Sequence, residues 1–354
     1  MLIFYLLLFA LTLWGVRWAG KGFLPEECLS RSVTDSVKGV FIILVFLSHF
    51  AGYVTYIAPI DKAGKSISAW LGQLIVTCFL FYSGYGVCEA IQKRGAAYVF
   101  PFPKNRIGKT LLHFDVAVLL FLVVRLCLGK TFSLKNILLS LVAWESLGNS
   151  NWYIFAVLML YLITWLAFLL VQKHHKYAAV LVTVLTVGYI VVLRAVRPRD
   201  TWWFDTVLCY PLGMWVSLLR RDLLRWLTKS NAVYGVSVLG LLAAFLATHH
   251  LRSAIGGEAW LPLQIANGML FCLLLTAVFL KVKVGNRLLE WCGQYTFELF
   301  ILQRIPMLIF KAMGIAEWNL YAFFLLSLGA TVGLAFGFRY CTDRLDRLLF
   351  AKKK

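Results

Sequence analysis

The sequence predicts an all-α fold, a polytopic membrane bundle of about eleven transmembrane helices. Hydrophobic residues make up 61% of the 354 residues and charged residues only 14%, whereas a water-soluble globule of this length carries far more charge. The apolar residues form runs of about 16 to 22, the length that crosses a ~30 Å hydrocarbon layer as helix. Each spanning segment must satisfy its own backbone hydrogen bonds, which favours helices over open strands.

The predicted spans share this apolar character and lie near residues 2–18, 37–56, 70–91, 110–128, 152–172, 178–194, 203–219, 232–248, 261–280, 294–312 and 320–338. The first run lacks a basic start and a small-residue cleavage site, so we interpret it as a retained extra helix before a ten-helix core. The chain then divides into this helix with its loop (1–30), a membrane domain (31–340) and a basic cytoplasmic tail (341–354). A short amphipathic helix from Asn136 to Leu147 is expected at the outer surface.

The formal charge of +19 reports orientation rather than nucleic-acid binding. With the N-terminus outside, the alternate loops on the cytoplasmic side hold 24 of the 35 lysines and arginines, and the outer loops hold 9. This bias is the positive-inside rule, and it predicts a multi-pass protein with its N-terminus outside and its C-terminus in the cytoplasm. The membrane expected is a plasma (bacterial inner) membrane. The partners expected on this basis include the lipid bilayer and no nucleic acid.

The eight cysteines are scattered through or beside the apolar runs, without a C-x-x-C pair or the spacing of metal ligands. We expect them to behave as small apolar residues. No metal site is predicted.

His49 is an ionisable residue within a long apolar run, which makes it the first candidate for a functional residue. It follows Lys38 by eleven residues, close to three helical turns, so the two share a helix face, with Asp35 near the same line. At ~1.5 Å per residue the imidazole is expected roughly 16 Å beyond Lys38, near the middle of a bilayer. An ionisable group at such depth is a candidate functional residue, and a histidine can act as a general base on a hydroxyl. The alternative is a histidine hydrogen-bonded inside a helix bundle.

A second basic cluster, around Arg106 and Lys109, follows an apolar run that contains Gly84. Glycine in a membrane helix lets a neighbouring backbone or a ligand come close. Arg106 and Lys109 are three residues apart and would share a face if a helix begins there. Such a pair suits a phosphorylated ligand, and positive-inside topology is the competing explanation.

The segment Arg31-Ser-Val-Thr-Asp35-Ser-Val-Lys38-Gly39, with His49 ten positions after the glycine, resembles the opening signature of the acyltransferase 3 family of integral membrane proteins. Further segments resemble motifs of that family in the same order: Tyr82-Ser83-Gly84-Tyr85, Arg106-x-x-Lys109, Asn151-Trp152-Tyr153, Cys209-Tyr-Pro211-Leu-Gly213-Met214, and Thr296-Phe297-Glu298-Leu-Phe300-Ile-Leu-Gln303. The resemblance covers roughly residues 31–338. Lys38 and Lys109 stand where the family has arginines, so the bidentate contact of arginine with phosphate is lost there.

The resemblance implies a membrane O-acyltransferase, usually an O-acetyltransferase that takes acetyl from cytoplasmic acetyl-CoA to a hydroxyl of a cell-surface or lipid-linked glycan. His49 would be the catalytic residue. Asp35 and Glu298 are further catalytic candidates; for Glu298 the alternatives are orienting His49, lining the acyl channel, or a structural hydrogen bond. The residues expected to bind acyl-CoA are Arg31, Lys38, Arg106, Lys109, Ser83 and Tyr85. Trp152 and Tyr153 are the candidates to face the sugar.

The rival hypothesis is a transporter or flippase of a lipid-linked sugar that uses His49 as a proton relay. Such a protein needs paired carboxylates deep within helices and helices broken at the midplane. The sequence offers one deep histidine and few deep acids, which favours the enzyme.

Overall fold

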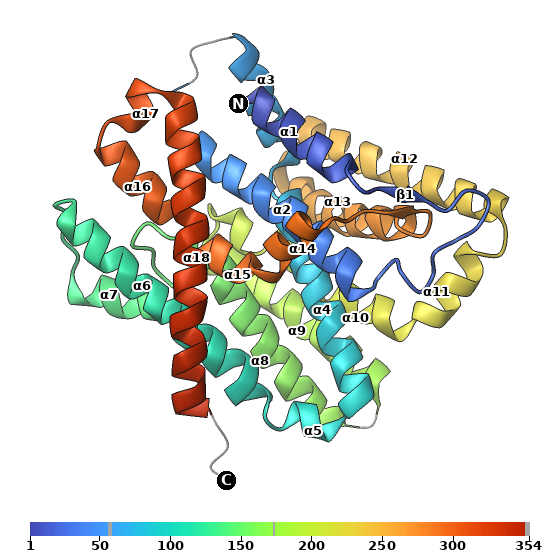
Figure 1. The fold of residues 1–354 in the computed structure, drawn as a ribbon. Coiled ribbons are helices and arrows are strands. Elements are labelled where there is room, and N and C mark those ends of the chain that lie inside the picture. The colour runs from blue at the N-terminus through green and yellow to red at the C-terminus, as the bar shows by residue number, and fades with distance from the viewer. Residues whose placement is uncertain (56–58, 173, 351–354) are drawn as a thin grey trace.

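The computed structural model describes residues 1–55, 59–172 and 174–350, and its helices form a bundle with one short two-stranded ribbon (Figure 1). Eight helices of the described chain are long and apolar enough to cross a membrane: Arg31–Ala51, Lys62–Arg94, Ala96–Cys127, Asn151–Val171, His175–Val196, Asn231–Ile255, Gly257–Val278 and Leu320–Phe350. The predicted all-α, multi-pass membrane fold is confirmed.

The first half of the chain comprises α1 (Leu2–Leu13), β1 (Arg17–Trp18), α2 (Arg31–Ala51), α3 (Pro59–Leu71), α4 (Leu74–Arg94), α5 (Ala96–Val99), the π-helical turn η1 (Pro103–Gly108), α6 (Lys109–Cys127), α7 (Leu134–Leu141) and α8 (Asn151–Val171). The second half comprises α9 (His175–Val196), η2 (Thr201–Trp203), α10 (Cys209–Leu218), α11 (Arg220–Leu227), α12 (Asn231–Ile255), α13 (Gly257–Val278), β2 (Val282–Lys283), α14 (Arg287–Gln294), α15 (Thr296–Leu302), α16 (Arg304–Ala312), α17 (Ile315–Trp318) and α18 (Leu320–Phe350).

Three of the predicted spans are short or broken helices. The first ends at Leu13, where Gly15 takes a positive φ of 83°. In the run 203–219 only α10 is helical from Cys209 onward, and Pro211 lies in its first turn, where a missing N–H is tolerated. The run 294–312 is divided at Tyr295 and Gln303; Pro306 cannot donate to the carbonyl of Leu302, which favours the second break.

Two further expectations are altered at their boundaries. The amphipathic helix expected from Asn136 to Leu147 is α7, which begins at Leu134 and ends at Leu141. The segment expected to be a tail from residue 341 continues α18 as helix to Phe350.

Glycines set the two closest helix contacts around the candidate site. A Cβ added at Gly84 of α4 would lie 2.0 Å from the carbonyl oxygen of Tyr210, and one at Gly213 of α10 would lie 2.0 Å from that of Phe81. Gly39 of α2 meets the carbonyl of Leu289 at the same distance. No side chain fits in these contacts, so the glycines allow α4 to pack on α10 and α2 on α14 backbone to backbone. The close approach predicted at Gly84 is confirmed.

The extra N-terminal helix belongs to a small core of its own. Phe4 of α1 stacks on Phe324 of α18 with ring centroids 3.7 Å apart and meets Phe50 of α2 edge-on at 6.3 Å. The rest of this core comes from α2, α16 and α18. The helix packs as an added layer on one side of the bundle (Figure 1).

Loops predicted to share one side of the membrane contact one another. β1 pairs with β2 through Arg17 and Lys283, and Lys283 also bonds Glu27, which lowers the pKa of that carboxyl below its usual value. Elsewhere on this side Lys109 pairs with Asp346 at 2.8 Å. The start of α1 and the end of α18 lie at opposite ends of the bundle in Figure 1.

Candidate active site

A cavity of about 1060 Å³ lies between α2, α4, α8 and α15. Its volume is at the upper end of the roughly 300–1,000 Å³ that is typical of ligand pockets. Six cationic side chains line it against three acidic ones. The cations are Arg31, Lys38, Lys93, Arg106, Arg220 and Arg339, and the acids are Glu26, Asp35 and Glu89. The excess of positive charge suits an anionic ligand.

Arg106 differs from the other cavity cations in its partners. The other five each lie within ion-pair distance of a carboxylate. Arg106 donates from Nε to the hydroxyl of Tyr98 at 3.0 Å, and within the described chain no carboxylate pairs with it. Its charge is therefore the one most available to a ligand.

Lys109 does not line the cavity, although it was predicted to act with Arg106. Its Nζ lies 2.8 Å from Asp346 Oδ2, on the side of α18. The reason is the backbone between them: residues 103–108 form a π-helical turn, whose wider coil removes the α-helical register on which the shared face depended. The structure thus brings Arg31, Lys38 and Arg106 together and separates Lys109 from them.

Ser83 and Tyr85 of α4 also line the cavity, as expected for residues that contact the ligand. The hydroxyl of Ser83 lies 3.0 Å from that of Tyr161 on α8, so the two close the gap between these helices. Tyr153, predicted to face a sugar, instead lines the deep end of this same cavity. Trp152 does not line it and packs edge-on against Tyr153 at 5.8 Å.

The cavity ends at an aromatic pair that separates it from His49. The rings of Tyr153 and Phe300 both line the cavity and lie 5.1 Å apart, and Phe300 lies 6.3 Å from the imidazole of His49. The Nε2 atom of His49 lies 3.3 Å from Ser150 Oγ, and its Nδ1 atom is buried without a partner in the described chain. The imidazole is thus adjacent to the cavity but behind the pair.

The sequence suggested that His49 lies midway along its helix, and this prediction is wrong. His49 is in the last turn of α2, which begins at Arg31 and ends at Ala51. The helix starts seven residues before Lys38, so the imidazole lies roughly 27 Å along the axis from Arg31. The cavity mouth and His49 are therefore near opposite ends of α2.

The other two catalytic candidates have different surroundings. Asp35 lies at the mouth, where its carboxylate accepts from Lys38 at 2.7 Å, roughly 21 Å along α2 from His49. Glu298 is buried and accepts from Arg339 Nε at 2.7 Å and Nη2 at 2.9 Å. Neither carboxylate contacts His49, so both geometries favour a role in holding a cavity cation in place.

Three residues near the site had not been predicted. Arg220 and Arg339 line the cavity, and Ser150 contacts His49. Arg220 and Arg339 lie in segments that looked like basic loops, where their charge was indistinguishable from positive-inside topology. The partnership of Ser150 with His49 joins positions 101 residues apart, and no local pattern marks it.

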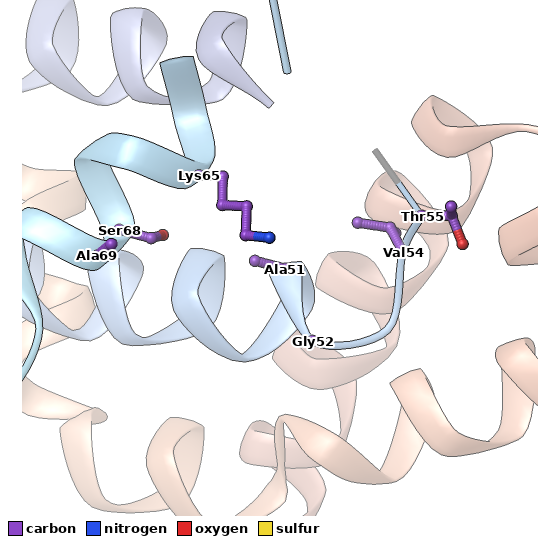
Figure 2. Close-up of a pocket in the computed structure, with 7 residues that line it drawn as sticks. All are labelled: Ala51, Gly52, Val54, Thr55, Lys65, Ser68 and Ala69. Atoms are coloured by element: carbon purple, nitrogen blue, oxygen red, sulfur yellow. The ribbon is translucent and has the colours of Figure 1, made fainter. Parts of the chain in front are cut away.

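A second, open hollow lies at the far end of α2, just beyond His49. Figure 2 shows its lining from the end of α2, the following loop and α3, with Lys65 extending toward Ala51. Its volume is about 720 Å³. The two spaces thus flank opposite ends of α2. Among the described residues, no three His, Cys, Asp or Glu side chains come together as a metal site.

The comparison with protein families gives one match. A model of an acyltransferase domain, acyltransferase 3, matches residues 34–340, nearly the whole chain. No curated protein and no solved structure matches the chain. The matched range contains α2 from its first turn, the cavity helices and most of α18. The chain therefore belongs to the acyltransferase 3 family and is a membrane acyltransferase.

Proposed function

We propose that the protein moves an acetyl group from acetyl-CoA, held in the cationic cavity, to a hydroxyl of a cell-surface or lipid-linked glycan, with His49 as the general base. The observation that carries this proposal is the continuity of the site. A cavity rich in arginine and lysine begins at Arg31 and ends at Tyr153 and Phe300, and Phe300 contacts the His49 ring. The phosphates of CoA are the kind of anion that such side chains bind.

The residues divide into two groups in this proposal. Arg31, Lys38, Arg106, Arg220 and Arg339 would hold the phosphates, with Ser83 and Tyr85 on the wall between them. The thioester would extend past Tyr153 and Phe300 to His49. The acceptor hydroxyl would approach from the other end of α2, where the second hollow lies (Figure 2). With the predicted orientation, the donor enters from the cytoplasm and the glycan from outside.

The chemistry is a single acyl transfer. The His49 imidazole removes the proton of the acceptor hydroxyl as the oxygen attacks the thioester carbonyl carbon. The carbon–sulfur bond then breaks, and the proton passes from the imidazole to the departing thiolate. The products are an ester and free CoA.

The rival function, transport with His49 as a proton relay, finds support in one observation. The segment from α14 to α16 is broken at Tyr295 and Gln303, as in many transporters. The paired deep carboxylates that such a relay needs have no counterpart at this site, because Asp35 pairs with Lys38 and Glu298 with Arg339. The two breaks instead place Phe297 and Phe300 on the cavity wall.

The test uses inside-out membrane vesicles that carry the full chain, supplied with [14C]acetyl-CoA. The proposal expects label in the carbohydrate fraction, and a loss of at least about a hundredfold with His49→Ala, the usual contribution of a general base. The matched control is His250→Ala, a histidine of α12 outside the site, which should leave transfer unchanged. Full transfer by His49→Ala would exclude His49 as the base.

A further inference from the structure

Ser150 precedes α8 in the position where a serine normally caps a helix. A capping serine accepts a hydrogen bond from a backbone N–H of the first turn, which stabilises the helix. The Ser150 side chain makes no such bond. Its hydroxyl, on a residue only 7% exposed, lies instead 3.3 Å from His49 Nε2. The serine thus gives its hydroxyl to the imidazole rather than to its own helix.

The position of Ser150 is fixed by its neighbours on both sides. Asn151 donates from Nδ2 to the carbonyl of Ala143 at 2.8 Å. Asn149 accepts from the backbone N–H of Leu147 at 3.1 Å, and its carbonyl accepts from Ser146 Oγ at 2.7 Å. These hydrogen bonds lie within the segment 143–151 and fix its conformation. The Ser150 hydroxyl is therefore held in place next to His49.

The surroundings of Nδ1, the second ring nitrogen of His49, distinguish two possible roles of Ser150: a nucleophile or a residue that positions His49. A nucleophilic serine works with a histidine whose other nitrogen is held by a third group. In the described chain Nδ1 of His49 is buried and has no partner. Buried polar atoms are nearly always hydrogen-bonded, so an unpaired nitrogen on the ring next to Phe300, which lines the cavity, is available to a substrate group. The geometry therefore favours Nδ1 as the reacting nitrogen and Nε2 as the held one.

We propose that Ser150 is a positioning residue that sets the tautomer of His49. Its oxygen accepts a hydrogen bond from Nε2–H, which leaves the lone pair of Nδ1 facing the reactants. Nδ1 takes the proton of the acceptor hydroxyl while that oxygen bonds to the thioester carbon. When the carbon–sulfur bond breaks, the same proton passes from Nδ1 to the thiolate, and Nε2 keeps its hydrogen throughout. This inference rests on the proposed acyl transfer.

The experiment compares Ser150→Ala, Ser150→Thr and Ser150→Cys in the vesicle assay with [14C]acetyl-CoA. Alanine removes the acceptor oxygen, and cysteine keeps the volume but is a weak acceptor. Both should lower kcat about tenfold, the equivalent of one neutral hydrogen bond, with the KM for acetyl-CoA unchanged. Threonine keeps the oxygen and should restore most of the activity. The melting temperature of Ser150→Ala should fall only by the small amount that the lost hydrogen bond to His49 contributes, because no capping bond is lost.

The matched control is Ser140→Ala. Ser140 is also buried, but its hydroxyl donates to the carbonyl of Asn136 in α7, so kcat should be unchanged. Parental kcat in Ser150→Ala would overturn the proposal. So would an acyl group found on Ser150 by mass spectrometry after acid quenching, because that result makes the serine a nucleophile. Parental activity in His49→Ala is a separate result that removes the proposed function itself.

Discussion

Arg106 combines two properties that the other cavity cations do not. It lines the cavity, and its charge is not paired with a carboxylate in the described chain. Lys109 lies three residues away but is bound to Asp346, outside the cavity. The two residues therefore allow a comparison between a proposed ligand contact, Arg106, and a structural ion pair, Lys109 with Asp346.

We expect Arg106→Ala to raise the KM for acetyl-CoA by about tenfold or more, because a hydrogen bond to a charged group contributes about 1.5–3 kcal/mol. Lys109→Ala, the matched control, should leave that KM unchanged. Initial rates over a range of acetyl-CoA concentrations give both values. An equal increase in the KM of the two variants would contradict the assignment of Arg106, rather than Lys109, to the binding of acetyl-CoA.

At this scale, the sequence could predict the residues whose signal is local. The spacing of Arg31, Asp35 and Lys38 along one apolar helix predicted three residues that line the cavity. His49 stood out as an ionisable group in an apolar run, but its predicted depth was wrong, because it lies in the last turn of α2. Contacts across the bundle had no such signal. Ser150 meets His49 only because α8 begins beside the end of α2, and Lys109 turns away only because residues 103–108 form a π turn.

Helix pairs meet backbone to backbone where glycines face each other, and the candidate site depends on this packing. Gly84 and Gly213 bring α4 against α10, while Gly39 brings α2 against α14. Both contacts lie beside the cavity, since Ser83, Tyr85 and Gly293 line it. A change at these glycines would displace the cavity wall.

We expect Gly213→Ala to lower the free energy of unfolding by at least about 1–3 kcal/mol, because its Cβ would overlap the carbonyl of Phe81 and the packed core leaves no room. The measurement is the thermal unfolding of purified protein in detergent. Gly188→Ala, in α9, is the matched control: its Cβ meets no other atom within 4 Å, so it should unfold at the parental temperature or slightly above. Equal melting temperatures for the two variants would exclude the tight contact.

The long apolar runs predicted the membrane-spanning segments well, because eight helical spans of the described chain are long and apolar enough to cross a membrane. Hydropathy could not show the breaks in the runs 203–219 and 294–312. They depend on backbone groups that Pro211 and Pro306 cannot supply and on contacts with distant helices. The clearest local sign was therefore proline, which a hydrophobicity window does not register.

On the scale of the whole molecule, the loops form two sets, one on each predicted side of the membrane. In the loop contacts given above, each loop bonds a loop of its own predicted side. Lys281 of one predicted inner loop bonds Asn231, the first residue of α12, which directly follows another predicted inner loop, at 2.6 Å. On the predicted outer side Arg197 is held between Trp144 and Trp203, 4.2 and 4.3 Å from the two rings. The positive-inside bias then predicts which set faces the cytoplasm.

Two native cysteines test that orientation. Cys127 ends α6 on the predicted outer side, Cys341 lies in α18 on the predicted inner side, and both are exposed. In intact cells a membrane-impermeant maleimide should label Cys127 and not Cys341, and permeabilised cells should show both. Mass spectrometry identifies the labelled cysteine. The variants Cys127→Ser and Cys341→Ser serve as controls, because each should lose the label of its own position. The reverse pattern would place the cationic cavity on the outside.

The aromatic pair at the end of the cavity has an electrical consequence. Water in a cavity that reaches Phe300 carries the potential of its own compartment inward, so most of the transmembrane voltage falls across the thin wall between that ring and the far surface. A charge that crossed the wall would experience about 2.3 kcal/mol per 100 mV. In the proposed reaction the acetyl group would pass it uncharged, and the polyanionic CoA would stay on the side from which it came. Acyl transfer through this wall, as proposed, would therefore require no electrical work at any membrane voltage.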